Sequence, residues 1–594
     1  MFKTLLFIGF LITSISVFAQ NVSYKLKMSK PQTHYFEVEM NISEIKDKEV
    51  EVKLPVWAPG SYLVREFSKN INLVKAFASN GKELKVQKSA KNKWVIASEG
   101  NSEISVKYEV YSFELSVRTS FLDLTHGFVS GPGVFMYIDQ AKENKGTLEV
   151  FPYKDFKVVS TALPLIKENN KEISKTYQFD NYDQLLDCPI EIGNQEVFDF
   201  TAGGTLHTVA IYGKGNYNIA TLKVDMAKIC ESATNVFGTN PNKNYTFIIH
   251  NVTDGQGGLE HVNSTTLSVN RWTYDAAEYS NFLSLVAHEY FHLWNVKRIR
   301  PRELGPFNYD EENYTTLLWV MEGFTSYYDE LLLVRAGYIS GDEFLSKLNS
   351  SLNYVEGSVG SRVQPVAHSS FDAWIKGYRP NENSSNTGMT YYSRGSLLAA
   401  LIDAMIIDKY EGKKCLDHFM QTLLEKYYKK EKRGFSDKEF QTELEVFLGQ
   451  DLSVFFNDYV FGTKIPDYNL ILNKIGVSAD YVGQSKPSFG GALNQNGNQL
   501  LIKTIRSGSA AEEAGLSPND EIIGCNGFRV DQGDLEAVIS GLKVGQNLNL
   551  LISRDLVLYE IIVKMANFEK PQYRLSFTND DKTFKNKSYW LRKQ

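Results

Sequence analysis

The chain contains few cysteines and carries little net charge. The first feature excludes disulfide-rich proteins, and the second argues against nucleic-acid-binding proteins. Only four of its 594 residues are Cys, and they lie far apart in the sequence: Cys188, Cys230, Cys415 and Cys525. This spacing excludes a disulfide framework and a Cys-type zinc site, and it favours buried free thiols. The formal net charge is −6, with no basic stripe interleaved with aromatics, so nucleic acid is not an expected partner.

Long apolar runs are also missing after the N-terminus, so no membrane span is expected in the mature chain. The N-terminal run itself is short. Lys3 precedes an apolar stretch over residues 5–17, and Val17-Phe18-Ala19 resembles a signal cleavage site. Residues 1–19 are therefore predicted to be a signal peptide, with an uncleaved anchor as the alternative. The expected localisation is outside the cytoplasm, either periplasmic or secreted.

From residue 20 to about 200, apolar and polar residues alternate over short runs such as 34–40 and 49–54. Clusters of Gly, Asn, Asp and Lys separate these runs. The pattern predicts an N-terminal antiparallel β domain over residues 20–200. Residues 54–62 break the alternation and are expected to form an ordered loop.

Residues 201–475 are predicted to form the next domain. It contains a strand at 245–249 and a Gly-rich turn at 255–258, and helical periodicity dominates after that turn. The clearest predicted helices cover residues 280–295, 315–336 and 393–410. Residues 476–566 form a small separate module with two strands and two short helices, and their succession resembles a PDZ domain. Residues 567–594 are a basic tail, expected to be solvated. The predicted fold class is multidomain α+β.

The motif that carries chemistry is His288-Glu289-Tyr290-Phe291-His292, which follows an apolar helical segment. On a helix, residues four positions apart share a face, so His288 and His292 can bind one metal ion. Glu289 lies beside them and can reach a water on that metal. The alternative is a helix with two incidentally spaced histidines.

A third protein ligand would distinguish a metal-binding helix from a helix with incidentally spaced histidines. Catalytic zinc sites use three protein ligands and leave one position open. Glu322 lies in the apolar, aromatic stretch 318–328, where a carboxylate is costly unless it is paired or metal-bound. Glu311 and Glu312 are weaker candidates, since they lie in a polar stretch.

The run from His288 to Pro301 closely resembles the glycyl aminopeptidase family. Members are gluzincin zinc metallopeptidases with a β-rich N-terminal domain, a thermolysin-like catalytic domain and a PDZ domain. Further matches lie at residues 55–62, 257–261, 370–374 and 391–395. The resemblance covers nearly all of the mature chain, and the order of the domains matches as well.

The resemblance implies a role for each matching residue. Glu322 would be the third ligand of one Zn²⁺ ion, with Glu289 as general base. Glu260 would bind the free α-amine of a peptide substrate, so that only the first peptide bond is cleaved. Tyr392 would stabilise the transition state, although Tyr391 adjoins it and only geometry can choose between them. The family also implies a preference for N-terminal Gly or Ala.

Two other functions remain open on sequence grounds. One is a zinc endopeptidase, in which Glu260 would not bind an amine. The other is a peptide-binding protein with little peptidase activity. Its PDZ-like module could capture a C-terminal peptide by strand addition, or it could simply pack against the catalytic core. A bacterial setting is favoured, because a glycan on Asn263 would obstruct the site.

Overall fold

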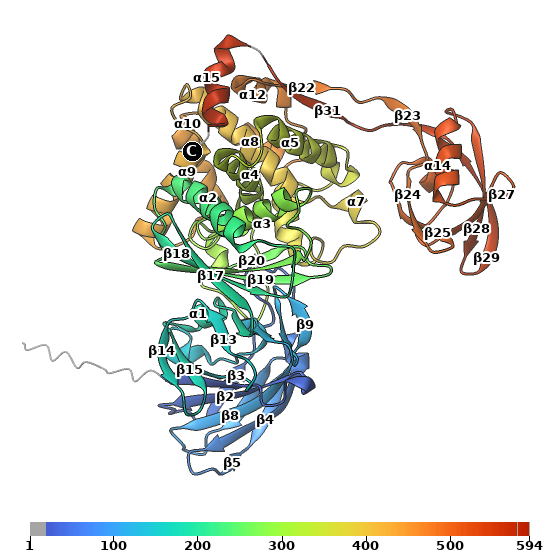
Figure 1. Ribbon diagram of the computed structural model, residues 1–594. Helices are drawn as coiled ribbons and strands as arrows, with labels where there is room; N and C mark the ends of the chain where they lie inside the picture. The colour runs from blue at the N-terminus through green and yellow to red at the C-terminus, as the bar shows by residue number, and fades with distance from the viewer. Residues whose placement is uncertain (1–19, 579, 593–594) are drawn as a thin grey trace, which may run out of the picture. The chain divides into compact units, whose positions relative to one another are not determined.

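The computed structural model describes residues 20–578 and 580–592, which fall into two compact units (Figure 1). Unit 1 comprises the chain up to Val56 together with Glu66–Asn194, and unit 2 comprises Trp57–Arg65 together with the chain from Gln195. The predicted signal peptide lies outside the described residues. Within the described ranges, no helix is long and apolar enough to cross a membrane.

Unit 1 is rich in β structure, as the alternating pattern predicts. Side chains of β2 alternate along the strand between buried and partly exposed, which is the pattern of a sheet with one face on a core. Its largest sheet has eight strands, and only β1 and β12 pair in parallel. In spatial order the strands are β14 (Leu165–Asn169), β15 (Ser174–Phe179), β12 (Gly146–Phe151), β1 (Asn21–Lys27), β2 (Tyr35–Ser43), β8 (Ile104–Tyr111), β4 (Ile71–Ala78) and β5 (Glu83–Leu84).

Two smaller antiparallel sheets and a short helix, α1 (Tyr182–Leu186), complete unit 1. The five-stranded sheet contains β13 (Val158–Thr161), β16 (Ile190–Gly193), β11 (Gly127–Val129), β10 (Thr119–Leu122) and β9 (Phe113–Ser116). The three-stranded sheet contains β3 (Glu49–Lys53), β7 (Lys93–Ala97) and β6 (Val86–Ala90).

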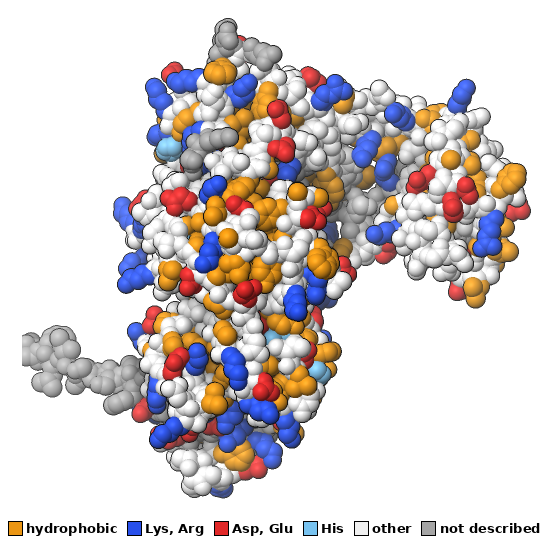
Figure 2. All heavy atoms as spheres, viewed as in Figure 1, with side chains coloured by type: hydrophobic (Ala, Val, Ile, Leu, Met, Phe, Trp, Pro, Cys, Tyr) orange, Lys and Arg blue, Asp and Glu red, His pale blue; other side chains and the backbone are white. Residues whose placement is uncertain are grey.

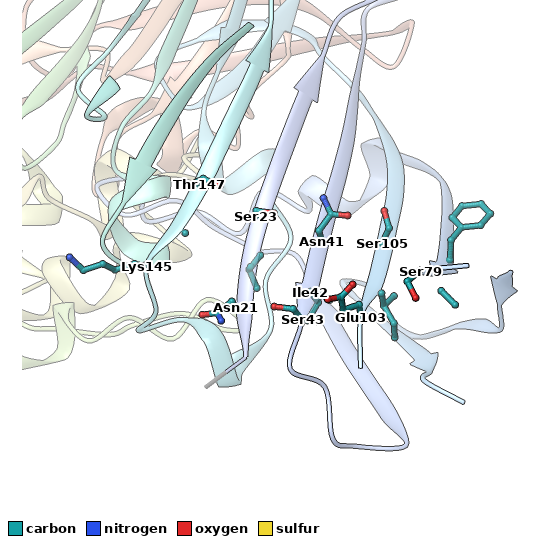
Figure 3. A pocket seen from close by; sticks show the side chains of 15 residues that line it. Asn21, Ser23, Asn41, Ile42, Ser43, Ser79, Glu103, Ser105, Lys145 and Thr147 are labelled. Atoms are coloured by element: carbon teal, nitrogen blue, oxygen red, sulfur yellow. The ribbon is translucent and has the colours of Figure 1, made fainter. Parts of the chain in front are cut away.

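A hollow of about 500 Å³ opens at one end of strands β1, β2 and β8 (Figure 3). Its lining is mostly Ser, Asn and apolar side chains, and Glu103 and Lys145 are the ionisable residues in it. No His or Cys lines it, so it lacks the side chains that the predicted metal chemistry requires.

Unit 2 begins with a mixed five-stranded sheet, in which β18, β19 and β21 are parallel and the two edge strands are antiparallel. In spatial order the strands are β17 (Glu196–Ala202), β18 (Thr205–Tyr212), β19 (Asn244–Val252), β21 (Ser264–Asn270) and β20 (Gly258–Glu260). Strand β20 lies at the edge of this sheet, but each of its residues is buried. The Gly-rich stretch that was predicted as a turn therefore leads into a buried strand.

The rest of this part of unit 2 is mainly helical, and α4 packs against both α3 and α8 (Figure 1). The predicted helices at 280–295, 315–336 and 393–410 are confirmed as α3, α4 and α8, with shifted ends. The helices are α2 (Ile219–Phe237), α3 (Tyr279–Phe291), α4 (Leu318–Ala336), α5 (Gly341–Glu356), α6 (Val366–Phe371), α7 (Ser384–Thr387), α8 (Tyr391–Lys409), α9 (Leu416–Leu423), α10 (Asp437–Leu448), α11 (Ser453–Phe455) and α12 (Tyr468–Leu472).

Local sequence signals explain several helix ends. A capping box of Ser340 and Glu343 begins α5, because each side chain accepts a backbone N–H that would otherwise be unpaired. Gly337 ends α4 in the left-handed region, with φ of +81°, which a residue without a side chain adopts at low cost.

The C-terminal module (residues 489–565) has a sheet with β24 (Gly491–Asn496) at one edge and β29 (Val557–Lys564) at the other. Between them lie β25 (Gln499–Ile505), β26 (Glu521–Cys525) and β28 (Asn547–Arg554), while β27 (Phe528–Arg529) pairs with β26. Helices α13 (Ala510–Glu513) and α14 (Gln532–Gly541) match the two predicted helices. The module has its own apolar core, which includes Leu500, Ile522 and Leu550.

Two strand pairs flank this module, and both combine a strand before it with a strand after it. Strand β22 (Val477–Tyr481) pairs with β31 (Tyr573–Phe577), and β23 (Ser485–Ser488) pairs with β30 (Ala566–Glu569). The expectation that the tail is solvated is wrong for its last helix, α15 (Asp581–Trp590). Trp590 is 1% exposed and donates a hydrogen bond to the Tyr327 hydroxyl at 2.7 Å. Burial of this large aromatic side chain outweighs the basic character of its neighbours.

The expectation of buried free thiols is confirmed. The four cysteines are buried and free. On the face drawn in Figure 2, Lys and Arg side chains are interspersed with Asp and Glu side chains, as the small net charge leads one to expect.

Candidate metal centre and active site

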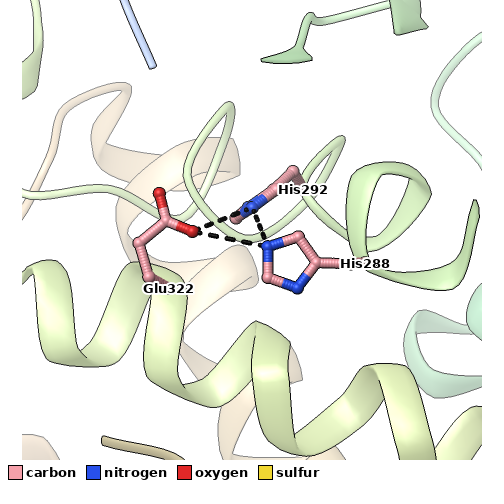
Figure 4. Close-up of side chains that lie close together, drawn as sticks. All are labelled: His288, His292 and Glu322. Atoms are coloured by element: carbon pink, nitrogen blue, oxygen red, sulfur yellow. Dashed lines mark hydrogen bonds and ion pairs between the residues drawn. The ribbon is translucent and has the colours of Figure 1, made fainter. Parts of the chain in front are cut away.

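The C-terminal end of α3 and the second turn of α4 bring two imidazoles and a carboxylate to one point (Figure 4). The Nε2 atoms of His288 and His292 are 3.1 Å apart. Glu322 Oε2 lies 3.5 Å from His288 Nε2 and 3.2 Å from His292 Nε2. Ligand atoms that surround zinc tetrahedrally at 2.0–2.1 Å are about 3.3 Å from one another. The spacing of these three atoms therefore fits zinc.

The other nitrogen of each imidazole also has a partner, and this partner fixes the tautomer that a metal ligand needs. His288 Nδ1 lies 2.9 Å from Asp329 Oδ2, and His292 Nδ1 lies 2.7 Å from the backbone oxygen of Asn295. An Nδ1–H that donates to these oxygens leaves the Nε2 lone pair free to face the centre of the cluster.

Asp329 was missed in the sequence-based prediction. It follows Glu322 by seven residues, which is two helical turns, so both carboxylates lie on the face of α4 that meets α3. That spacing was the available signal.

We expect Asp329→Asn to weaken zinc affinity by about 10- to 100-fold, because an outer partner of a ligating histidine orients the ring and raises its basicity. Competition with a chromogenic chelator measures this directly. Asp342→Asn, on the exposed first turn of α5, is the matched control and should leave the affinity unchanged. Equal affinities in the two variants would contradict a role for Asp329.

A close crossing of two helices sets Glu322 beside Tyr392. A Cβ on Gly323 would lie 2.4 Å from the Cα of Gly395, and a Cβ on Gly395 would lie 2.3 Å from the backbone oxygen of Trp319. Any larger residue at either position would push α4 away from α8. This contact gives a physical reason for a glycine one residue after Glu322 and for a glycine three residues after Tyr392.

Glu289 is buried next to the two imidazoles. Its Oε2 atom has no hydrogen-bond partner among the described residues. Its side chain lies against the backbone of Gly258, where a Cβ would come within 2.3 Å of the Glu289 carboxyl carbon. Burial raises the pKa of Glu289 above its ordinary value, although His288 and His292 oppose the rise. This carboxylate can therefore accept a proton from a group bound at the cluster.

Glu260, on edge strand β20, is only 5% exposed, so it is not a solvent-facing carboxylate at a strand edge. Its carboxylate lies near Glu289 and His292, because ligand atoms of these three residues fall within 4.8 Å of one another. A third carboxylate beside Glu289 and Glu322 leaves the site with excess negative charge. A divalent cation and a substrate ammonium would offset that charge.

Tyr391 and Tyr392 both lie in the first turn of α8, and their surroundings differ. The Tyr392 ring lies 6.3 Å from the His288 ring and inclined to it by 25°. Burial raises the pKa of Tyr392 well above its ordinary value, and the nearby carboxylate of Glu322 adds to the rise. Tyr391 is buried and stacks on Tyr392 at 4.8 Å between ring centroids. Tyr392 is thus the tyrosine that borders His288.

The arginines that follow the motif have structural partners. The Arg298 guanidinium donates to the backbone oxygen of Leu293 at 2.5 Å and to Asn242 Oδ1 at 2.8 Å. Arg300 donates to the backbone oxygen of Gly305 at 2.6 Å. Glu311 and Glu312 are absent from the sets of described residues that could hold a metal, so Glu322 is the carboxylate that meets the two histidines.

The chain is similar to known peptidases over most of its length. Residues 23–194 match the Peptidase M61 N-terminal domain, and residues 281–398 match the M61 glycyl aminopeptidase model. A solved aminopeptidase N family protein from Idiomarina loihiensis is 30% identical, with a TM-score of 0.88, over 96% of this chain and 100% of that chain.

A second similarity covers a shorter segment. A probable CtpA-like serine protease from Staphylococcus saprophyticus is 28% identical over 159 residues, which are 26% of this chain and 30% of that protein. The chain thus spans under a third of the length of that curated relative. The two family models and the full-length structural match agree with each other and with the geometry of the site, and the chain belongs to the M61 glycyl aminopeptidase family.

Proposed function

We propose that the protein is a zinc-dependent aminopeptidase that hydrolyses the N-terminal peptide bond of peptides. The observation that carries this proposal is the convergence of His288, His292 and Glu322 on one point, with Glu289 and Glu260 beside them. Family membership supports the same reaction. We propose one Zn²⁺ ion, held by His288, His292 and Glu322.

Bound zinc would lower the pKa of a water molecule and polarise the scissile carbonyl. Glu289 would take the proton of the attacking water and pass it to the leaving amine, a role for which its buried and unpartnered Oε2 is suited. The Tyr392 hydroxyl would donate a hydrogen bond to the developing oxyanion. Glu260 would pair with the substrate ammonium, so that the first peptide bond is the one that reaches Glu289.

The test is an assay of the purified protein on glycyl, alanyl and leucyl amides and on N-acetylated versions of each. We expect hydrolysis of the free amines, loss of activity with a chelator and recovery with Zn²⁺. Equal cleavage of free and acetylated substrates would favour the zinc endopeptidase instead. Faster cleavage of leucyl than of glycyl and alanyl amides would contradict the proposed preference for Gly or Ala, which is supported only by the family.

The assignment of the oxyanion tyrosine gives a separate prediction. We expect Tyr392→Phe to lower kcat by about 10²–10³-fold with little change in KM, because the lost hydrogen bond forms in the transition state. Tyr391→Phe is the matched control, since it removes the same atom from the adjacent buried ring. A larger loss in the Tyr391 variant would reverse the assignment.

For the C-terminal module we propose a PDZ-like domain that binds a C-terminal peptide alongside β24. Strand β24 forms an edge of its sheet and lies near α14, the arrangement that strand addition requires. Residues 489 and 490 connect β23 to β24, and Gly490 has φ of +83°. Fluorescence anisotropy with peptides bearing free or amidated C-termini tests this, and equal binding of the two would oppose it.

We also propose that the protein is exported to a bacterial periplasm or secreted, on the basis of residues 1–19. N-terminal sequencing of the mature protein should give Gln20 as the first residue. A mature chain that retains residues 1–19 would instead support the uncleaved anchor.

A further inference from the structure

The turn formed by Trp57–Arg65 is part of unit 2, although unit 1 supplies the chain on both sides of it. Ala58 and Ser61 are bridged, with the Ser61 N–H donating to the Ala58 oxygen at 2.9 Å. Gly60 lies between them with φ of +82°, in the left-handed region. Its backbone oxygen accepts a hydrogen bond from the Tyr378 hydroxyl at 3.4 Å.

Gly60 lies directly against Glu260. A Cβ on Gly60 would lie 2.7 Å from one carboxylate oxygen of Glu260 and 2.9 Å from the other. It would also lie 2.7 Å from Leu259 Cδ1. These distances are too short for any real Cβ contact, so a side chain at residue 60 and the present position of the Glu260 carboxylate exclude each other.

Aromatic side chains of the turn pack against other aromatic residues and hold it in place. The Trp57 indole donates to the backbone oxygen of Asn308 at 2.8 Å, and its ring lies 5.2 Å from that of Trp374. The Tyr62 ring, which is 1% exposed, lies 5.7 Å from the same tryptophan. Arg65 donates to Ser61 Oγ at 2.9 Å. The turn is therefore held in place by its contacts. A side chain at residue 60 would displace the end of the Glu260 side chain.

We propose that Gly60 is a positioning residue for recognition of the substrate amine. Its missing side chain leaves room for the Glu260 carboxylate to lie where a substrate ammonium is bound. This inference rests on the proposed aminopeptidase function. It also gives a role to residues 55–62 and to Trp374, which resemble family positions. The metal-binding motif His288–His292 does not explain either of them.

The experiment compares Gly60→Ala with Gly337→Ala. The two glycines have φ of +82° and +81°, so an Ala costs similar backbone strain at both. A Cβ on Gly337 meets no atom within 4 Å, whereas a Cβ on Gly60 meets the Glu260 carboxylate. Melting temperature, zinc content and kcat/KM on free and N-acetylated glycyl substrates are measured for both variants, for wild type and for Glu260→Gln.

We expect the two Gly→Ala variants to melt at similar temperatures and to hold equal zinc. Only Gly60→Ala should lose selectivity for the free amine, by about 10- to 100-fold, the range that one hydrogen bond to a charged group implies. Glu260→Gln should lose it in the same direction. Retention of wild-type selectivity by Gly60→Ala, with the Glu260 variant impaired, would overturn this inference alone. A wild type that does not distinguish free from blocked substrates would overturn the proposed function instead.

Discussion

Replacing Glu289 with Gln is expected to lower kcat by about 10²–10⁴-fold, the contribution typical of general acid–base catalysis. The amide has nearly the shape of the carboxylate but does not accept a proton at neutral pH. The carboxylate Oε2 is buried without a hydrogen-bond partner among the described residues, so it is free to act on a water and on the leaving amine. KM should change little, because the lost interaction belongs to the transition state.

The zinc content of Glu289→Gln should equal that of wild type, because Glu289 is not among the three residues that converge on one point in Figure 4. Glu278→Gln, just before the first turn of the same helix, is the matched control and should keep full activity. Steady-state kinetics with metal analysis separates the outcomes. If the Glu289 variant keeps more than a tenth of the wild-type kcat while fully loaded with zinc, the general base lies elsewhere.

Local patterns were sufficient to predict most of the elements that carry the site. The apolar run before His288 and the four-residue spacing of the two histidines predicted α3, and Trp319 to Tyr328 predicted the helix that carries Glu322. These predictions succeeded because a helix places residues three and four positions apart on one face, whatever surrounds it. The ends were less accurate: His292 lies just beyond α3, where it contacts the backbone oxygen of Asn295 and the carboxylate of Glu322.

Such local patterns could not predict contacts between segments that lie far apart in the sequence. The turn around Gly60 was expected only as an ordered loop of the β domain, and nothing in its sequence indicates that it meets Glu260, two hundred residues further along. The burial of Trp590 against Tyr327 is hidden in the same way by the basic residues around it. Each depends on which surfaces meet in three dimensions, and periodicity does not encode that.

The second large effect is expected from Glu322→Gln, which should remove most of the zinc and with it nearly all activity. The carboxylate is 3% exposed and lies within 3.5 Å of both Nε2 atoms, so it supplies charge as well as a ligand atom. Burial would raise its pKa, but His292 and His288 hold the pKa below its ordinary value, which keeps the group ionised. A neutral amide cannot replace that charge in a buried site. The loss of affinity should therefore exceed the 10- to 100-fold expected for an outer partner such as Asp329.

Glu312→Gln is the control that makes this result specific. Both substitutions change one carboxylate in the region after the motif, and Glu312 was one of the two weaker candidate ligands in the sequence. Dialysis against a zinc buffer followed by metal analysis should give close to one zinc per chain for wild type and Glu312→Gln, and far less for Glu322→Gln. A Glu322 variant that binds zinc as tightly as wild type would show that the third ligand is another residue. The role of Glu322 would then be to neutralise the charge that His288 and His292 gain on protonation, and the site would have to be rebuilt around Glu260, Glu289 and His292, the other described set whose ligand atoms lie within 4.8 Å.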